Sequence, residues 1–234
     1  MKYAFILTIL LITIPNAWSG CVDSNSDDKQ VLATCLKEAD GGDPEAQLAL
    51  ADIYLDGKIV PQNYQQALEW YRQAAQQGNA HAMYNIGVFY DRGYSVDVDY
   101  EEASNWYRKA AALGFPAALY NIGIMYEYGQ TVPKDYAKAH EYYLMAAEKG
   151  EPSAQFSLGL LYDKGLGVGK DYVTAYMWWE ITGDGHIYAK QNNESIATEM
   201  TPMQISEAKR LAGLWLKKHN VKQLPAQEFP PGFK

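Results

Sequence analysis

The side chains best suited to chemistry are scattered along this chain of 234 residues. No two of its four histidines stand three or four positions apart, as a helical pair of metal ligands requires. No Gly-x-Ser-x-Gly elbow holds a serine nucleophile either. The four histidines are His81, His140, His186 and His219. These patterns identify no catalytic residue and no metal site, and they predict neither a cofactor nor an enzyme.

One glycine-rich stretch resembles a phosphate-binding loop at first sight. Residues 165–170 read Gly-Leu-Gly-Val-Gly-Lys, which is shorter than a Walker motif. The stretch follows no expected strand and falls in a loop between two expected helices. We therefore expect no nucleotide to bind there.

The strongest regularity is a repeat that would position side chains at fixed intervals. Four tyrosines recur every 36 residues, each with an alanine eight positions before it and a glycine three positions after it. The tyrosines are Tyr54, Tyr90, Tyr126 and Tyr162. A fixed period of this length is typical of a solenoid, whose units bury their apolar faces by stacking on their neighbours. The sequence predicts an all-α fold, an α/α superhelical solenoid.

Each repeat is expected to form two helices. Proline at 44, 116 and 152 suits the first position of a helix, and the glycine after each tyrosine suits the end of that helix. Gly87, Gly123 and Gly159 lie inside the first helices, where glycine costs about 1 kcal/mol relative to alanine. This repeated cost predicts a close approach of the paired helix, with aromatic rings packed across the gap.

The repeats divide the chain into expected segments. We predict a signal peptide at 1–19, a tail at 20–30 and an N-terminal capping helix at 31–42. Four repeats follow at about 46–81, 82–117, 118–153 and 154–189, within a repeat region of 43–189. C-terminal capping helices are expected at 190–220, near 190–199 and 206–219, and an extended tail at 221–234.

The first residues predict export. Lys2 precedes an apolar run from Phe5 to Ile14, and Ala17 and Ser19 are the small residues that signal peptidase recognises. We place cleavage after Ser19, which predicts a periplasmic or secreted protein. The apolar run is too short for a transmembrane helix, which needs about 20 residues.

The two cysteines, Cys21 and Cys35, allow two interpretations. In an oxidising compartment they would form a disulfide, and we favour this pairing. Alternatively, Cys21 follows the signal run closely enough to accept a bacterial lipid anchor, although Trp18 replaces the leucine-like residue usual three positions before such a cysteine.

The charge balance argues against nucleic acid as a partner. The net charge is −8, and no stretch of clustered lysine and arginine is present for binding phosphates. The excess of acidic residues favours solubility and basic partner surfaces.

The repeat resembles the Sel1-like repeat family, a relative of the tetratricopeptide repeat. The resemblance is carried by residues 154–172, which read Ala-Gln-Phe-Ser-Leu-Gly-Leu-Leu-Tyr-Asp-Lys-Gly-Leu-Gly-Val-Gly-Lys-Asp-Tyr, and by residues 103–114. It implies an adaptor that binds protein partners. Cysteine-rich members are linked to penicillin binding or hydrolysis, so a weak hydrolase or penicillin-binding activity is the alternative. This chain has no cysteine after Cys35, so it departs from the cysteine-rich members, and the case for their activity in this chain is weaker.

Comparison with tetratricopeptide geometry places the first helix of each repeat on a concave wall. An aromatic stripe bordered by mostly acidic charge is expected there, and such rings with polar neighbours are typical of binding hot spots. The candidate partner-binding residues are Tyr84, Val88, Asp91, Arg92, Tyr120, Ile124, Glu127, Tyr128, Phe156, Asp163 and Lys164. The alternative is that these rings only pack between helices and that the charges only solvate the wall. A third possibility is self-assembly through other faces of the solenoid.

Overall fold

The computed structural model describes residues 21, 27–183 and 186–219. These residues form helices and turns, and no strand occurs among them. The chain divides into two compact units, the first ending at Asn79 and the second beginning at Ala80. The predicted signal peptide and the predicted tail from 221 lie outside the described residues.

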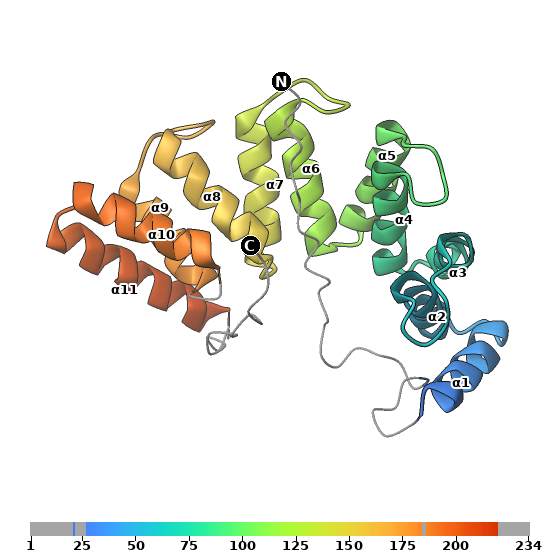
Figure 1. The fold of residues 1–234 in the computed structure, drawn as a ribbon. Helices are drawn as coiled ribbons and strands as arrows, with labels where there is room; N and C mark the ends of the chain where they lie inside the picture. Colours follow the sequence, from blue (N-terminus) through green and yellow to red (C-terminus); the bar gives the residue numbers. More distant parts are fainter. Residues whose placement is uncertain (1–20, 22–26, 184–185, 220–234) are drawn as a thin grey trace. The chain divides into compact units, whose positions relative to one another are not determined.

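Figure 1 shows the helices in chain order. The first unit contains α1 (Asp28–Asp40), α2 (Pro44–Asp56) and α3 (Tyr64–Gln76). The second unit contains α4 (Ala80–Arg92), α5 (Tyr100–Ala112), α6 (Pro116–Tyr128), α7 (Tyr136–Glu148), α8 (Pro152–Lys164), α9 (Tyr172–Thr182), α10 (Ile187–Ile196), the 3₁₀ turn η1 (Ala197–Glu199) and α11 (Pro202–Lys218). Consecutive helices pack as pairs, which confirms the predicted all-α solenoid of helix pairs.

Short polar residues and glycines set the helix ends. Asp99, Asp135 and Asp171 accept backbone N–H groups at the starts of α5, α7 and α9, which satisfies donors that the helix itself leaves unpaired. Gly129 ends α6 in the left-handed conformation, at φ 72°. The glycine three positions after each repeated tyrosine therefore ends its helix, as the sequence predicts.

The glycines inside the first helices allow the predicted close approach. A Cβ atom at Gly87 would lie 2.6 Å from Cε1 of Tyr107, and one at Gly123 would lie 2.4 Å from Cε1 of Tyr143. A Cβ atom at Gly159 would lie 2.2 Å from Nε1 of Trp179. Large rings of the second helices thus occupy the space that side chains would need, and the cost of helical glycine is offset by this packing.

The most deeply buried rings lie on the second helices and are not those of the repeated tyrosines. Tyr71, Tyr107, Tyr143 and Trp179 are at most 2 % exposed. The repeated tyrosines of the first helices, such as Tyr126, are only half-buried, as is Trp106 of the preceding position. The helix register explains the difference between Trp106 and Tyr107. Tyr107, one residue further along α5, is the ring that packs on Gly87 of α4.

A disulfide joins Cys21 to Cys35 of α1. Both cysteines are buried in a cluster with Val31, Leu50 and other residues of α1 and α2. The N-terminal end of the first unit is thereby fastened to its apolar core. This arrangement agrees with the favoured interpretation of the two cysteines.

The C-terminal helices begin earlier than their sequence suggests. The sequence places them near 190–199 and 206–219, whereas α10 starts at Ile187 and α11 at Pro202. His186 caps α10, with its side chain accepting the N–H of Ala189. Thr201 and Gln204 form a capping box at the start of α11. Pro202 therefore begins a helix, where its missing N–H costs nothing, instead of only breaking the chain.

None of the helices in the described ranges is both long enough and apolar enough to cross a bilayer.

Candidate functional site

The candidate site is built from equivalent positions of α4, α6 and α8. We call it the α4–α6–α8 face and define it by Tyr84, Tyr120 and Phe156 together with Asp91, Glu127 and Asp163. All six side chains are half-buried. Since they come from the same positions of successive first helices, the repeat presents them on one side of the second unit.

Each aromatic side chain of this face packs on the buried ring of the paired helix. Ring centroids lie 5.7 Å apart for Tyr84 and Tyr107, 5.4 Å apart for Tyr120 and Tyr143, and 6.4 Å apart for Phe156 and Trp179. These separations are typical of aromatic pairs that attract each other. The rings are therefore held in place by the core while part of their surface stays open.

The sequence reasoning missed two further aromatic partners on this face. Phe115 lies between His81 and Tyr84, with ring centroids 5.2 Å from each. His186 stacks on Phe156 at 4.4 Å. Both missed residues lie at helix starts outside the repeated aromatic positions, so the period does not reveal them.

Glu151 is another residue that the sequence reasoning missed. Its side chain is only 7 % exposed and accepts the N–H of Ser153 at 3.3 Å, at the start of α8. Burial raises the pKa of this carboxyl, whereas the bonds from Ser153 lower it. Its charge also raises the pKa of Tyr84 and of Tyr120.

The hydroxyls of the face are tied to neighbouring helices. Burial raises the pKa of Tyr84 and of Tyr120 to about 12, and hydrogen bonding with Asn121 and Ser157, respectively, lowers it in part. Tyr143 donates a hydrogen bond of 2.6 Å to Glu127. Burial, and then the charge of Glu127, hold the pKa of Tyr143 far above its usual range. These tyrosines are therefore neutral hydrogen-bonding groups at physiological pH and cannot act as bases.

The remaining predicted residues flank the face. Val88 and Ile124 are half-buried and pack on the hydrophobic clusters. Arg92 is half-buried, Lys164 is exposed, and Tyr128 has half of its surface exposed, 50 %. The predicted set thus lies on α4, α6 and α8 of the second unit, with Tyr128 and Lys164 as its most exposed members.

The histidines lie apart from each other and have separate local roles. His140 shares a hydrogen bond of 3.0 Å with the Tyr162 hydroxyl, and His219 stacks on Trp215 at 3.9 Å. His81 and His186 stack on the rings described above. Within the described ranges, no group of three or more His, Cys, Asp or Glu side chains is arranged to hold a metal ion.

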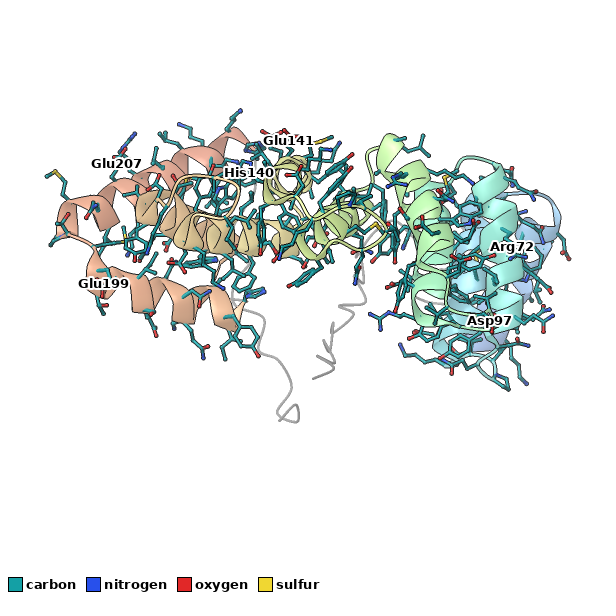
Figure 2. All side chains as sticks on the ribbon, turned by 90° about the horizontal axis from the view of Figure 1, so that it is seen from above. Arg72, Asp97, His140, Glu141, Glu199 and Glu207 are labelled. Carbon is teal, nitrogen blue, oxygen red and sulfur yellow. A yellow bond between two sulfur atoms is a disulfide. The ribbon has the colours of Figure 1, made fainter. Side chains whose placement is uncertain are left out.

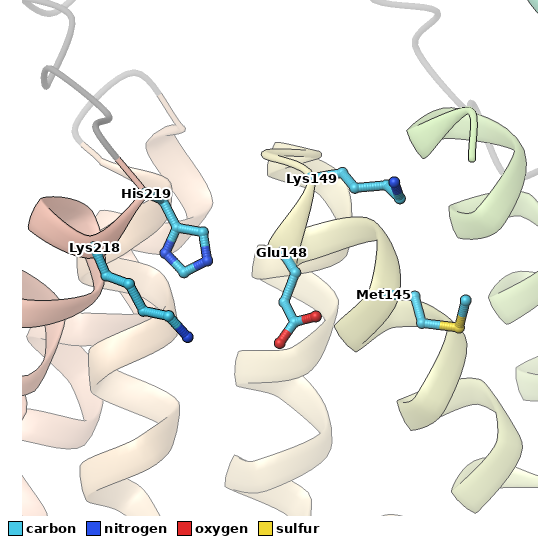
Figure 3. Close-up of a pocket in the computed structure, with 5 residues that line it drawn as sticks. All are labelled: Met145, Glu148, Lys149, Lys218 and His219. Atoms are coloured by element: carbon cyan, nitrogen blue, oxygen red, sulfur yellow. The ribbon is translucent and has the colours of Figure 1, made fainter. Parts of the chain in front are cut away.

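A shallow recess lies between the ends of α7 and α11 (Figure 3). Lys218 and His219 line one side, and Met145, Glu148 and Lys149 line the other. None of the predicted site residues contributes to it. A Ser-x-x-Lys spacing also occurs on α11, at Ser206 and Lys209, but both side chains are exposed. Both locations lie open at the surface.

The first unit carries a related tyrosine–carboxylate pair. Tyr71 donates a hydrogen bond of 2.5 Å to Asp52 of α2. Burial raises the pKa of Asp52 to about 6, against the lowering effect of the bond from Tyr71. A carboxyl whose pKa is raised by folding stabilises the fold while protonated. That contribution is lost as the pH rises from about 4 through 6.

We expect Asp52→Asn to make the first unit more stable at pH 7, by roughly 1–3 kcal/mol, with little change at pH 4. Hydrogen exchange of α2 and α3, corrected for the intrinsic effect of pH, measures this locally. The exposed Asp40→Asn variant serves as the control and should follow the wild type. Equal exchange in Asp52→Asn and in the wild type at both pH values would show that ionisation of Asp52 does not destabilise the first unit.

Comparison with protein families and solved structures gives a consistent result. The Sel1 repeat model matches residues 44–79, 80–115, 116–151 and 152–184. A Sel1 repeat protein from Oxalobacter formigenes is 34 % identical with a TM-score of 0.67, over 73 % of this chain and 49 % of that one. A protective antigen present in uropathogenic Escherichia coli strains is 28 % identical with a TM-score of 0.57, over 88 % and 54 %. The chain spans about half the length of these two proteins.

A more distant structure shows the fold alone. An immunity protein from Pseudomonas aeruginosa is 20 % identical with a TM-score of 0.53, over 86 % of this chain and 76 % of that one. A comparison with curated protein sequences gave no match. The four matched repeats cover most of the helical region and agree with the helix pairs and their glycine–ring contacts. The chain therefore belongs to the Sel1 repeat family.

Proposed function

We propose that the protein is an exported adaptor that holds a segment of another envelope or secreted protein on the α4–α6–α8 face. Sel1 repeat proteins generally mediate protein–protein interaction, and the family consists mainly of scaffolds without enzymatic activity. One observation carries the proposal. Tyr84, Tyr120 and Phe156 keep part of their surface open at the same position of the first helices of three successive repeats. Rigid aromatic side chains of this kind supply much of the energy of protein interfaces.

The disulfide supports the exported part of the proposal. Disulfides persist in oxidising compartments and are rare in the cytosol, where thiols are kept reduced. A bond between Cys21 and Cys35 also uses the thiol that a lipid anchor would need. The export signal at 1–19 and cleavage after Ser19 remain part of the proposal. Mass spectrometry of the mature chain from cells tests both, because a lipid would add to the mass expected for residues 20–234.

Site-specific photo-crosslinking tests the adaptor role. We expect a benzoylphenylalanine at position 128, beside the face, to form an adduct with an envelope protein in the cells that produce this chain. The matched control is position 100 at the start of α5, because Tyr100 is 51 % exposed and Tyr128 is 50 % exposed. Adducts at both positions, or at neither, would refute the proposed face.

A further inference from the structure

The three carboxylates of the α4–α6–α8 face differ in the residue that comes directly after each of them. Asp91 is followed by Arg92, and Asp163 is followed by Lys164. Glu127 is followed by Tyr128 instead. The middle repeat therefore lacks the neighbouring cation that both flanking repeats supply at this position.

The electrostatics around α6 reflect this difference. The charged groups that shift the pKa of Tyr120 are Glu127 and Glu151, and both raise it. By contrast, Arg92 lowers the pKa of Tyr84 one repeat earlier. The surroundings of Tyr120 are thus negative, in a partly buried place where charge interactions are screened less than at an open surface.

The geometry around Glu127 also suits a cation. The Tyr143 hydroxyl donates to one carboxylate oxygen, Oε2, and Tyr128 also hydrogen-bonds to this carboxylate. The two oxygens of a carboxylate offer about four acceptor positions, so Glu127 can accept from a cation as well. Tyr120 packs 5.4 Å from Tyr143 on one side, and Tyr128 follows directly with half of its surface exposed. A carboxylate between aromatic rings binds an ammonium or guanidinium group through charge and through the faces of the rings.

A second observation marks the neighbouring part of the face as incomplete. Among the residues that the structure describes, none pairs with the buried Tyr107 hydroxyl, although its equivalents Tyr71 and Tyr143 each donate to a carboxylate. Asn121 of α6 is a polar neighbour that lowers the pKa of Tyr107, and the same amide also lowers the pKa of Tyr84. A buried hydroxyl left unpaired costs free energy, so the carboxylate contact of Tyr143 is a feature of the α6–α7 pair that the α4–α5 pair lacks.

We propose that the segment held on this face places an arginine or lysine side chain at Glu127, between Tyr120 and Tyr128, with Glu151 adding to the negative field. The inference rests on the proposed function and names the partner's chemistry: a basic segment. The net charge of −8 brings such a segment toward the protein, but the site at α6 decides where its cation is bound.

A display library of random twelve-residue peptides, panned at about 150 mM salt to screen long-range attraction, tests this proposal. Peptides selected by the wild-type chain should be enriched in arginine and lysine. A selected peptide should bind at least tenfold more weakly to Glu127→Gln, which keeps an acceptor for Tyr143 but removes the charge. Tyr128→Arg, which supplies the missing internal cation, should weaken binding as strongly.

The matched control is Glu141→Gln. Glu141 is an exposed carboxylate of α7, next to His140, and its replacement removes the same charge outside the face (Figure 2). This variant should change binding less than twofold. No enrichment of basic residues, or equal losses for Glu127→Gln and Glu141→Gln, would overturn the inference. If the inference fails but the photo-crosslinked adduct at position 128 forms, the proposed adaptor role is retained and only the basic partner is rejected. If no adduct forms, both proposals are rejected.

Discussion

Replacing Gly123 with alanine should destabilise the second unit by about 2 kcal/mol. The new Cβ atom would lie 2.4 Å from Cε1 and 2.5 Å from Cδ1 of Tyr143, a ring with no exposed surface. Overpacking of a close-packed core costs about 1–3 kcal/mol. Alanine also stabilises a helix by up to about 1 kcal/mol relative to glycine. The destabilisation by overpacking should be larger than this gain. The midpoint of urea unfolding, followed by circular dichroism, measures the effect.

Movement of the Tyr143 ring does not remove this cost. In α2 the equivalent position is Ala51, and there Tyr71 donates to Asp52, the next residue along the helix. In α6 the residue after Gly123 is Ile124, whose side chain has no hydrogen-bond acceptor. A displaced Tyr143 would therefore lose its hydrogen bond to Glu127 and find no replacement.

Gly213→Ala is the matched control for this substitution. Gly213 lies inside α11, and no atom of the described residues lies within 4 Å of a Cβ atom placed there. Alanine should stabilise this helix by up to about 1 kcal/mol. If both variants shifted the midpoint in the same direction, the packing of Tyr143 on Gly123 would not be the cause.

Loss of the disulfide should destabilise the first unit by about 3 kcal/mol. The bond joins residues 14 positions apart, and a loop of this size contributes about that much in the chain-entropy model. Hydrogen exchange of α1 and α2 in the Cys21→Ala/Cys35→Ala variant should rise accordingly. Exchange of α6 and α7 in the second unit serves as the internal reference and should not change.

Reduction of the wild-type chain provides the second arm of this experiment. A reductant should raise exchange in α1 of the wild type toward the level of the double variant and leave the variant unchanged. Equal exchange in the oxidised, reduced and substituted chains would show that the bond does not hold α1. Because both cysteines are buried beside Val31 and Leu50, alanine also leaves some space unfilled, which adds to the loss in the variant only.

The sequence alone determined the fold class and most of the helix boundaries. A period of 36 residues requires units that stack, since one helix pair cannot bury its own apolar face. Glycine, proline and aspartate at fixed places within the period mark the helix ends because few other residues satisfy the backbone there. The close packing at Gly123 was predictable in the same way, from the cost of a repeated helical glycine.

Only the tertiary structure decided which rings are core and which stay open. Periodicity cannot separate Tyr142 from Tyr143, since both recur with the repeat, but the contact with Gly123 buries the second of them completely. Nor could the sequence show that the charge of Glu151 raises the pKa of Tyr84, because the two residues lie in different repeats and interact only in the folded chain. Secondary structure follows from local spacing, whereas burial and charge at a surface depend on residues that folding brings together.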